Sequence, residues 1–224
     1  MMNLLVNNES KATVISSFDT IAKSLFCDFQ LEVNKHYYRL LDIEFYYYCD
    51  KVFEDGYAHK HEAQLQSGKW YFHGSGIDIT IGDGINHGGI LIRAVAKISG
   101  ESSFDKNFIE KEIHGPLNVK TEICSKLKGA FEKELNTFCF HNISGDRMGA
   151  GMILPKHIIK SKRIGLNSKN DNQLQEFHNG KFRYVIIPYL KLRDKTQIAI
   201  DMKQQFPDMP ISEINKELGS AFLK

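Results

Sequence analysis

The residues with the clearest chemical potential lie in RLLDIEFYYYC, an apolar and aromatic run at residues 39–49 that contains Asp42 and Glu44. Alternate residues of a β-strand point to the same face, so Asp42, Glu44 and Tyr46 are expected to share one face. If that face lines a cleft, loss of water and a neighbouring like charge both raise the carboxyl pKa of Glu44, which suits a general base. An ordinary glutamate on an exposed strand face stays open as the alternative, and the spacing alone favours it.

A second group of candidate functional residues is HKH at residues 59–61. Two histidines at positions i and i+2 of a strand point the same way and could bind a metal. A cupin-like site would place a glutamate three or four residues after the second histidine. Here Glu62 follows at once, with Gln64 and Gln66 after it, so the sequence predicts no metal site while leaving a His-bound metal as a weak alternative.

Aromatic residues and one arginine complete the candidates. Trp70, Tyr71 and Phe72 in SGKWYFHGSG can belong to a core, or they can stack on a nucleobase, because every base has a π-face. Arg93 interrupts the apolar run GILIRAVAKI, and a buried charge needs a partner, either an internal carboxylate or a bound phosphate. The sequence contains no Walker loop, GxGxxG or GxSxG motif.

The helices and strands that must position these residues can be predicted from the sequence pattern. Together they indicate a single α+β domain with a mainly antiparallel, curved sheet flanked by helices. Apolar spacing indicates helices, and β-branched or aromatic alternation indicates strands. Helices are expected over residues 11–27, 104–113 and 119–135, and a short helix capped by Ser212 is expected within residues 210–223. Strands are expected over residues 28–33, 36–48, 69–74, 77–82, 89–98, 156–167 and 181–192. The domain is expected to span residues 1–188, with a C-terminal extension at 189–224.

Composition limits the class of protein. The 224 residues are 42% hydrophobic and 25% charged, which is typical of a soluble globular chain. The net charge of +2 is too small to indicate nucleic-acid binding by itself. The apolar runs are too short to cross a bilayer, and the start of the chain has no secretory pattern, so the expected location is cytoplasmic. The cysteines lie far apart in apolar surroundings and are expected to be buried free thiols: Cys27, Cys49, Cys124 and Cys139.

Taken in chain order, short motifs across roughly residues 20–188 resemble those of the alkyladenine (3-methyladenine, methylpurine-type) DNA glycosylase family. IAKSLFCDFQLEV is similar to the family's A-x-x-L-L-G and the strand after it, and RLLDIEFYY is similar to R-I-V-E-T-E-A-Y. GYAHKHE resembles D-x-A-x-H, KWYFHGSGIDITIG resembles the strand pair with a second stacking aromatic, and GILIRAV resembles V-L-L-R-A. HGPLNVKTEICSKLKG is similar to G-P-G-K-L-x-x-A-L-G, and KRIGLN with KFRYVI is similar to R-I-G-V and W-R-F-Y-V.

The resemblance implies roles for individual residues. Glu44 would take a proton from the water that attacks C1′ of a nucleotide flipped out of the duplex. The flipped base would lie in a pocket formed by Tyr46, Phe72 and His59, with His61 as the second choice for the histidine. Phosphates would be held by Arg93 and by the basic segments 120–128 and 156–163, through Lys120, Lys126, Lys160, Lys162 and Arg163. The alternative for these basic segments is a solvated face.

The resemblance also implies partners and product. The substrate would be double-stranded DNA that carries alkylated or deaminated purines such as 3-methyladenine, hypoxanthine or ethenoadenine, and an abasic site would remain after excision. A monomer is expected, with no cofactor, no metal and no membrane. The family fills the gap left by the flipped base with a tyrosine, and this chain has Ser75 at that place, with His73 as a possible substitute. Two alternatives therefore stay open: a relative that binds DNA without this chemistry, and an unrelated metal protein.

Overall fold

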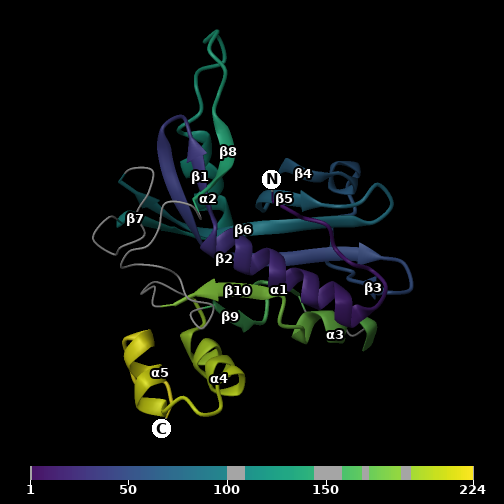
Figure 1. Cartoon of the computed structure of the whole chain (residues 1–224), viewed down its shortest axis with the longest axis vertical. Coiled ribbons are helices and arrows are strands. Elements are labelled where there is room, and N and C mark those ends of the chain that lie inside the picture. Colours follow the sequence, from purple (N-terminus) through teal and green to yellow (C-terminus); the bar gives the residue numbers. More distant parts are fainter. Residues whose placement is uncertain (1, 100–108, 144–157, 168–171, 188–192, 224) are drawn as a thin grey trace.

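The computed structural model describes residues 2–99, 109–143, 158–167, 172–187 and 193–223, and it shows a single α+β fold with a curled antiparallel sheet and a few helices (Figure 1). The strands are β1 (Phe29–Val33), β2 (His36–Cys49), β3 (Phe53–Glu54), β4 (Ser67–His73), β5 (Gly76–Ile81), β6 (His87–Ile98), β7 (Ile109–His114), β8 (Phe138–Asn142), β9 (Ile158–Ser161) and β10 (Arg183–Ile186). The helices are α1 (Lys11–Cys27), the 3-10 turn η1 (Glu62–Leu65), α2 (Pro116–Cys124), α3 (Asn172–Asn179), α4 (Lys195–Gln205) and α5 (Ile211–Leu218).

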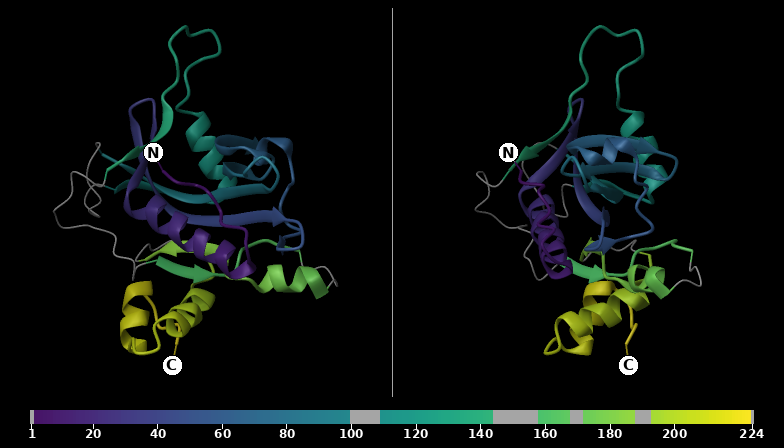
Figure 2. Two further views of the ribbon diagram at one scale, coloured as in Figure 1. Left: turned by 45° about the vertical axis from the view of Figure 1, so that its right-hand side comes forward. Right: turned by 90° about the vertical axis from the view of Figure 1, so that its right-hand side faces the viewer.

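The long strands β2 and β6 form the centre of the sheet. The strand order is β4-β5-β6-β2-β1-β8, and every pair is antiparallel. Strand β2 also pairs with β3 and with β10, β10 pairs with β9, and β6 pairs with β7. Because β2 and β6 have several partners each, the sheet branches and curls instead of staying flat, as the two views of Figure 2 show.

Helix α1 covers one face of β2 and fixes the direction of its side chains. The helix spans Lys11–Cys27, which confirms the helix that the sequence predicts there, and a capping box between Ser10 and Thr13 starts it. Phe18 stacks on Phe45 with ring centroids 4.5 Å apart and meets Tyr47 edge-on at 6.2 Å. Since Phe45 and Tyr47 point toward α1, the alternate residues of β2 point to the opposite face, which confirms the predicted division of this strand.

Two predicted helices differ from the structure. Within the expected helix 104–113, residues 109–113 belong to strand β7, which pairs with β6 through partners such as Val95 and Ile113, and residues 104–108 lie outside the described part. The expected helix 119–135 ends at Cys124. Its second half has good helix formers but no surface to cover, because Phe131 is 99% and Leu135 is 91% exposed. Asn34 instead binds the Lys126 carbonyl and closes this segment as a loop.

The C-terminal helices pack on the β9–β10 side of the fold (Figure 1). Gln205 accepts a bond from the backbone nitrogen of Lys160 at 3.1 Å and donates to the Ile158 carbonyl at 2.9 Å, and Lys181 pairs with Asp201 at 2.9 Å. Helix α5 begins after Pro210 without a side-chain cap, so the predicted cap at Ser212 is wrong.

Two further sequence expectations concern the thiols and the membrane. Cys49 is buried and Cys27 is half-buried, but Cys124 and Cys139 are exposed, so the expectation of four buried thiols is wrong for these two. Cys124 lies at the end of a short helix and Cys139 on an outer strand, where neither has a covering layer. Within the described ranges, no helix is long and apolar enough to cross a membrane.

Candidate functional site

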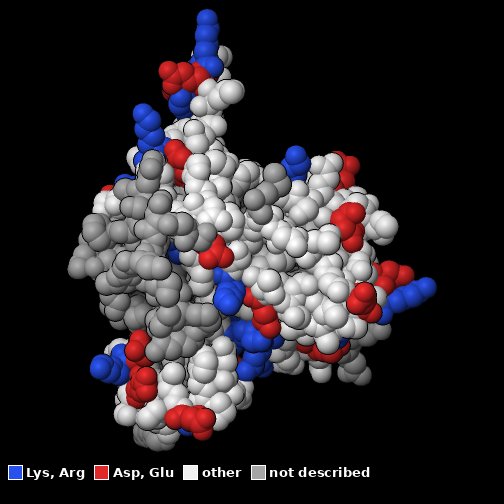
Figure 3. Space-filling model, viewed as in Figure 1, with Lys and Arg blue, Asp and Glu red and all other residues white. Residues whose placement is uncertain are grey.

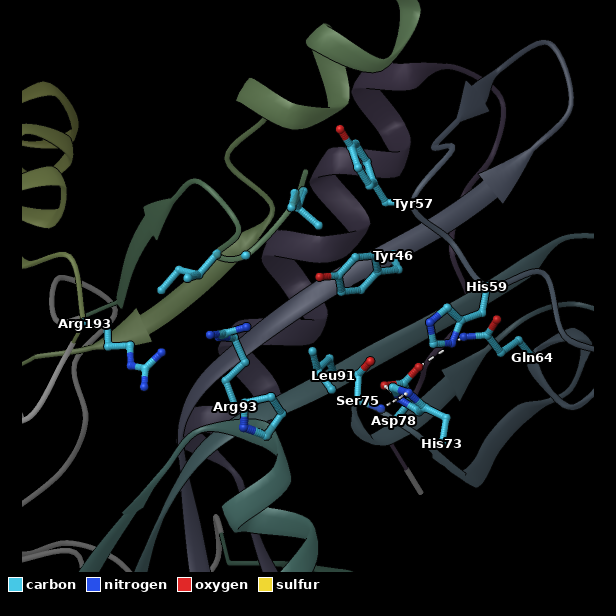
Figure 4. Close-up of a pocket in the computed structure, with 14 residues that line it drawn as sticks. Tyr46, Tyr57, His59, Gln64, His73, Ser75, Asp78, Leu91, Arg93 and Arg193 are labelled. Atoms are coloured by element: carbon cyan, nitrogen blue, oxygen red, sulfur yellow. Dashed lines mark hydrogen bonds and ion pairs between the residues drawn. The ribbon is translucent and has the colours of Figure 1, made fainter. Parts of the chain in front are cut away.

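A pocket of about 370 Å³ opens on the face of β2 that is turned away from α1 (Figure 4). Side chains from β2, β4, β5 and β6 meet there with the start of α2 and the segment after β9. The residues that line it are Tyr46, Tyr57, His59, Gln64, His73, Ser75, Asp78, Leu91, Arg93, Pro116, Ile164, Gly165, Leu166 and Arg193. The pocket therefore brings together residues from most of the chain, including several that the sequence singled out.

Glu44 lies directly beneath this pocket and is fully buried. Its Oε1 accepts a hydrogen bond from the Ile164 backbone nitrogen at 2.7 Å, and its Oε2 accepts from the Tyr46 hydroxyl at 2.8 Å and from Arg93 Nη1 at 3.1 Å. Burial raises the pKa of Glu44 above its usual value, while the charge of Arg93 opposes this rise. All of its partners donate, and this arrangement suits an ionised carboxylate that accepts protons.

Asp42 and Arg183 extend this polar group. Arg183 holds Asp42 through two hydrogen bonds, from Nε at 3.0 Å and from Nη2 at 2.8 Å, and Arg93 Nε lies 3.8 Å from the same carboxylate. We call Asp42, Glu44, Arg93 and Arg183 the acid–arginine cluster. Its two carboxylates and two guanidinium groups balance each other in charge, which is the condition for keeping so many charges away from water.

Tyr46 is held by a second buried ion pair. The guanidinium carbon of Arg163 lies 4.4 Å from the centre of the Tyr46 ring, while Arg163 binds both oxygens of Asp55 at 2.6 and 3.1 Å. Burial and the nearby Glu44 charge raise the pKa of Tyr46, so its hydroxyl remains a donor. The guanidinium of Arg163 is thus enclosed and positions Tyr46, whereas the sequence predicted a contact with phosphates.

The opposite wall of the pocket contains a second polar group, Gln64, His73 and Asp78, which we call the histidine–aspartate cluster. His73 Nε2 lies 2.9 Å from Asp78 Oδ1, and Gln64 Nε2 donates to Asp78 Oδ2 at 3.1 Å (Figure 4). The ring of His59 meets that of His73 edge-on at 4.6 Å. Partial burial lowers the pKa of His59, so its neutral ring can accept or donate a hydrogen bond to a ligand.

The structure brings some of the predicted site residues together and leaves others apart. Tyr46, His59 and Arg93 line the pocket, and Glu44 lies beneath it. Phe72 does not line it: this side chain is 42% exposed and lies toward Phe138, with ring centroids 6.0 Å apart. Arg93 faces the pocket and pairs with Glu44 within the acid–arginine cluster. Of the two partners that the sequence allows for Arg93, the structure therefore shows the internal carboxylate.

The predicted phosphate-binding lysines lie at several places on the surface. Lys120 donates to the His73 carbonyl at 2.8 Å, close to the pocket. Lys126 pairs with Glu122 at 3.5 Å, Lys160 with Asp19 at 3.1 Å, and Lys162 donates to Asn179 at 2.9 Å. On the face in Figure 3, basic and acidic side chains are mixed. The structure therefore shows dispersed basic residues and not one continuous basic stripe on that face.

Tyr57, Gln64, Asp78 and Arg193 line the pocket although the sequence reasoning did not select them. For Asp78 a signal was present: one aspartate stands in IDITI, a strand otherwise free of charge, and a buried carboxylate must have partners. His59 and His61 do not converge on a common point with other ligands, since His61 stacks on Tyr71. Among the described residues, no group of three or more His, Cys, Asp or Glu could hold a metal.

No protein-family model matches this chain, and no curated protein matches it. The site is therefore interpreted from its own geometry, and the resemblance to the glycosylase family remains a hypothesis based on short motifs.

Proposed function

We propose that this chain is a divergent DNA glycosylase of the alkyladenine type, with a fold of the methylpurine glycosylase kind, which flips and excises alkylated or deaminated purines. The observation that carries the proposal is the position of Glu44. It is a buried carboxylate, bound only by donors, directly beneath a pocket whose wall includes Tyr46. A general base for hydrolysis needs this combination of an acceptor and an adjoining space for a planar substrate.

The proposed reaction uses few groups. A purine flipped from the duplex enters the pocket and stacks against Tyr46, with His59 at its edge. Glu44 Oε1 accepts one bond, from Ile164, and its remaining lone pair takes the proton of a water that attacks C1′. The N-glycosidic bond breaks, the base leaves with the bonding electron pair, and an abasic sugar remains. Arg93 and Tyr46 stabilise the charged form of Glu44 before the proton moves.

DNA binding would rely on phosphate contacts around the pocket. Arg193 lies at the pocket and is exposed, and Lys120 is held beside the same wall through the His73 carbonyl. Lys126, Lys160 and Lys162 would add contacts that depend on salt and not on sequence. Arg163 is left out of this set because Asp55 and Tyr46 occupy its guanidinium.

The test is single-turnover release of hypoxanthine, ethenoadenine and 7-methylguanine from labelled duplex DNA. Glu44→Gln should lower the rate by about 10²- to 10⁴-fold, because it removes the base while keeping the shape of the side chain. Glu62→Gln is the matched control, since Glu62 is an exposed glutamate outside the pocket and should keep the wild-type rate. Thermal melting of both variants checks that each is folded.

One observation favours a second candidate function, a relative that binds DNA without excising a base. Ser75 lines the pocket. The motif resemblance aligns Ser75 with the family's tyrosine wedge, and a serine is too small to fill the gap in a base stack. Duplex binding that weakens with salt, without release of any base by the wild type, would support this second function and contradict the first.

A further inference from the structure

We infer that Asp78 makes the pocket selective for purines that carry a positive charge, the class formed by alkylation of a ring nitrogen, over neutral purine lesions. This inference rests on the proposed function, because it names the substrate class of the same site. It arises from the distribution of charge between the two walls of the pocket.

The hydrogen bonds of His73 determine its charge. The backbone N–H of Ser75 donates to His73 Nδ1 at 3.2 Å, and a ring nitrogen that accepts a hydrogen bond carries no proton. The single ring proton therefore lies on Nε2 and points to Asp78 Oδ1 at 2.9 Å. In this arrangement His73 is a neutral donor, and it leaves the negative charge of Asp78 uncompensated.

The hydrogen bonds of Gln64 determine the orientation of its side-chain amide. The backbone N–H of His61 donates to Gln64 Oε1 at 3.4 Å, so the amide nitrogen is the atom turned toward Asp78. Gln64 is also a neutral donor. Both partners of Asp78 are thus fixed from behind by backbone groups, and each supplies a hydrogen bond without supplying a charge.

Among the described residues, the other charged groups at the pocket do not pair with Asp78. Arg93 belongs to the acid–arginine cluster, where Glu44 and Asp42 balance it. Lys120 Nζ binds the His73 carbonyl, and Arg193 is exposed. In the described part of the chain, no lysine or arginine lies within ion-pair distance of Asp78.

The result is a carboxylate that is 3% exposed, lines the pocket and lacks a cationic partner among the described residues. A buried charge of this kind is costly, and a ligand that brings the opposite charge removes part of the cost. A neutral purine of the same shape does not. Charge-assisted contacts to a carboxylate predict roughly a ten- to hundredfold preference for the cationic ligand.

The backbone makes specific room for this carboxylate. A Cβ atom on Gly89 of β6 would lie 2.5 Å from Asp78 Oδ2 and 2.7 Å from Gln64 Nε2. Real Cβ atoms do not approach other atoms so closely, so the glycine permits the Asp78–Gln64 pair to lie against β6. The cluster is therefore built into the sheet and does not depend on a mobile loop.

The test compares two nucleosides that are isomers, 1-methyladenosine, which is a cation at neutral pH, and N6-methyladenosine, which is neutral. Calorimetric titration of the wild type should show a ten- to hundredfold tighter Kd for the cation. Asp78→Asn, which keeps the shape, should reduce this ratio to about one, whereas Asp50→Asn, at an exposed turn, should keep it. Equal affinities in the wild type, an unchanged ratio in Asp78→Asn, or no binding of either nucleoside at millimolar concentration would overturn the inference.

A parallel measurement separates this inference from the proposed function. Excision of 7-methylguanine and of hypoxanthine from duplex DNA is compared in the wild type and in Asp78→Asn. A preference for the cationic nucleoside without excision would retain the inference and contradict the glycosylase. Excision with the same lesion ratio in both proteins would retain the glycosylase and overturn the inference.

Discussion

The two walls of the pocket handle buried charge in opposite ways. The acid–arginine cluster places two carboxylates against two guanidinium groups, so its charges cancel within the protein. The histidine–aspartate cluster surrounds its single carboxylate with hydrogen bonds from neutral groups. The first wall is complete without a ligand, whereas the second becomes electrically complete when a cation enters. In the proposed glycosylase, the first wall would supply the general base and the second wall would select the ligand.

The largest effect is expected when the balance of the first wall is broken. Asp42→Ala leaves Arg183 buried without its carboxylate, and removal of one partner of a buried ion pair costs about 3–5 kcal/mol of the free energy of unfolding. Urea denaturation measures this loss. The double variant Asp42→Leu with Arg183→Met should recover a large part of it, because both charges are then gone. Equal destabilisation of the single and double variants would show that the pairing is not the cause.

The second wall should respond less strongly in stability but more strongly in selectivity. Gly89→Ala forces Asp78 and Gln64 to move, which costs about 1–3 kcal/mol and should abolish the preference for the cationic nucleoside. Gly74→Ala is the control, because a Cβ there meets no atom within 4 Å. Denaturation and nucleoside titration measure the two effects, and a preference that survives Gly89→Ala would contradict the role given to this cluster.

A substitution of Arg93 tests the first wall alone, because it leaves Asp78 and its hydrogen-bond partners unchanged. Arg93 favours the charged form of Glu44, so Arg93→Met should raise the pKa of Glu44 further. Because the base must be ionised, the acidic limb of the excision rate then moves to higher pH, and each pKa unit costs about tenfold in rate on that limb. Arg193→Gln should leave the limb in place. A pH profile that is identical in wild type and Arg93→Met would refute this coupling.

The smallest effect is expected outside both walls. Lys162 is half-buried and its side chain donates to Asn179, a neutral partner, so Lys162→Gln should change the free energy of unfolding by less than about 1 kcal/mol. If it contacts a phosphate, the slope of log affinity against log salt concentration should fall by about 0.9. Titrations of duplex DNA at several salt concentrations measure the slope, and an unchanged slope would exclude Lys162 from the proposed phosphate contacts.

The first wall was partly predictable from the sequence and the second was not. Alternation along β2 placed Asp42, Glu44 and Tyr46 on one face, and the structure confirms this. Their partners could not be predicted in the same way, because Arg183 reaches Asp42 from 141 residues away. Asp78 was missed because local pattern shows that a strand carries a charge but does not show which side chains meet it across a hairpin.

The same distinction applies to the fold. The α+β class and the antiparallel sheet follow from strand alternation and the short turns between strands, and the structure confirms both. The helix expected over 119–135 was wrong in its second half, since helix propensity describes the chain alone and this segment has no surface to pack against. The sequence predicts a helix over residues 104–113, but the free edge of β6 binds residues 109–113 of this segment as a strand.

The partners of Glu44 lie far apart in the sequence, and this affects when the site forms during synthesis of the chain. The donors to Glu44 are 2, 49 and 120 positions away from it in the sequence, and Arg183, which binds Asp42, is 141 positions after that residue. During synthesis, β2 is complete long before the ribosome has released Ile164 and Arg183. Distant contacts also form slowly, so the acids of β2 are paired last. An intact pocket is thus a late product of folding, and a partly synthesised chain still lacks the donors that hold Glu44 and Asp42.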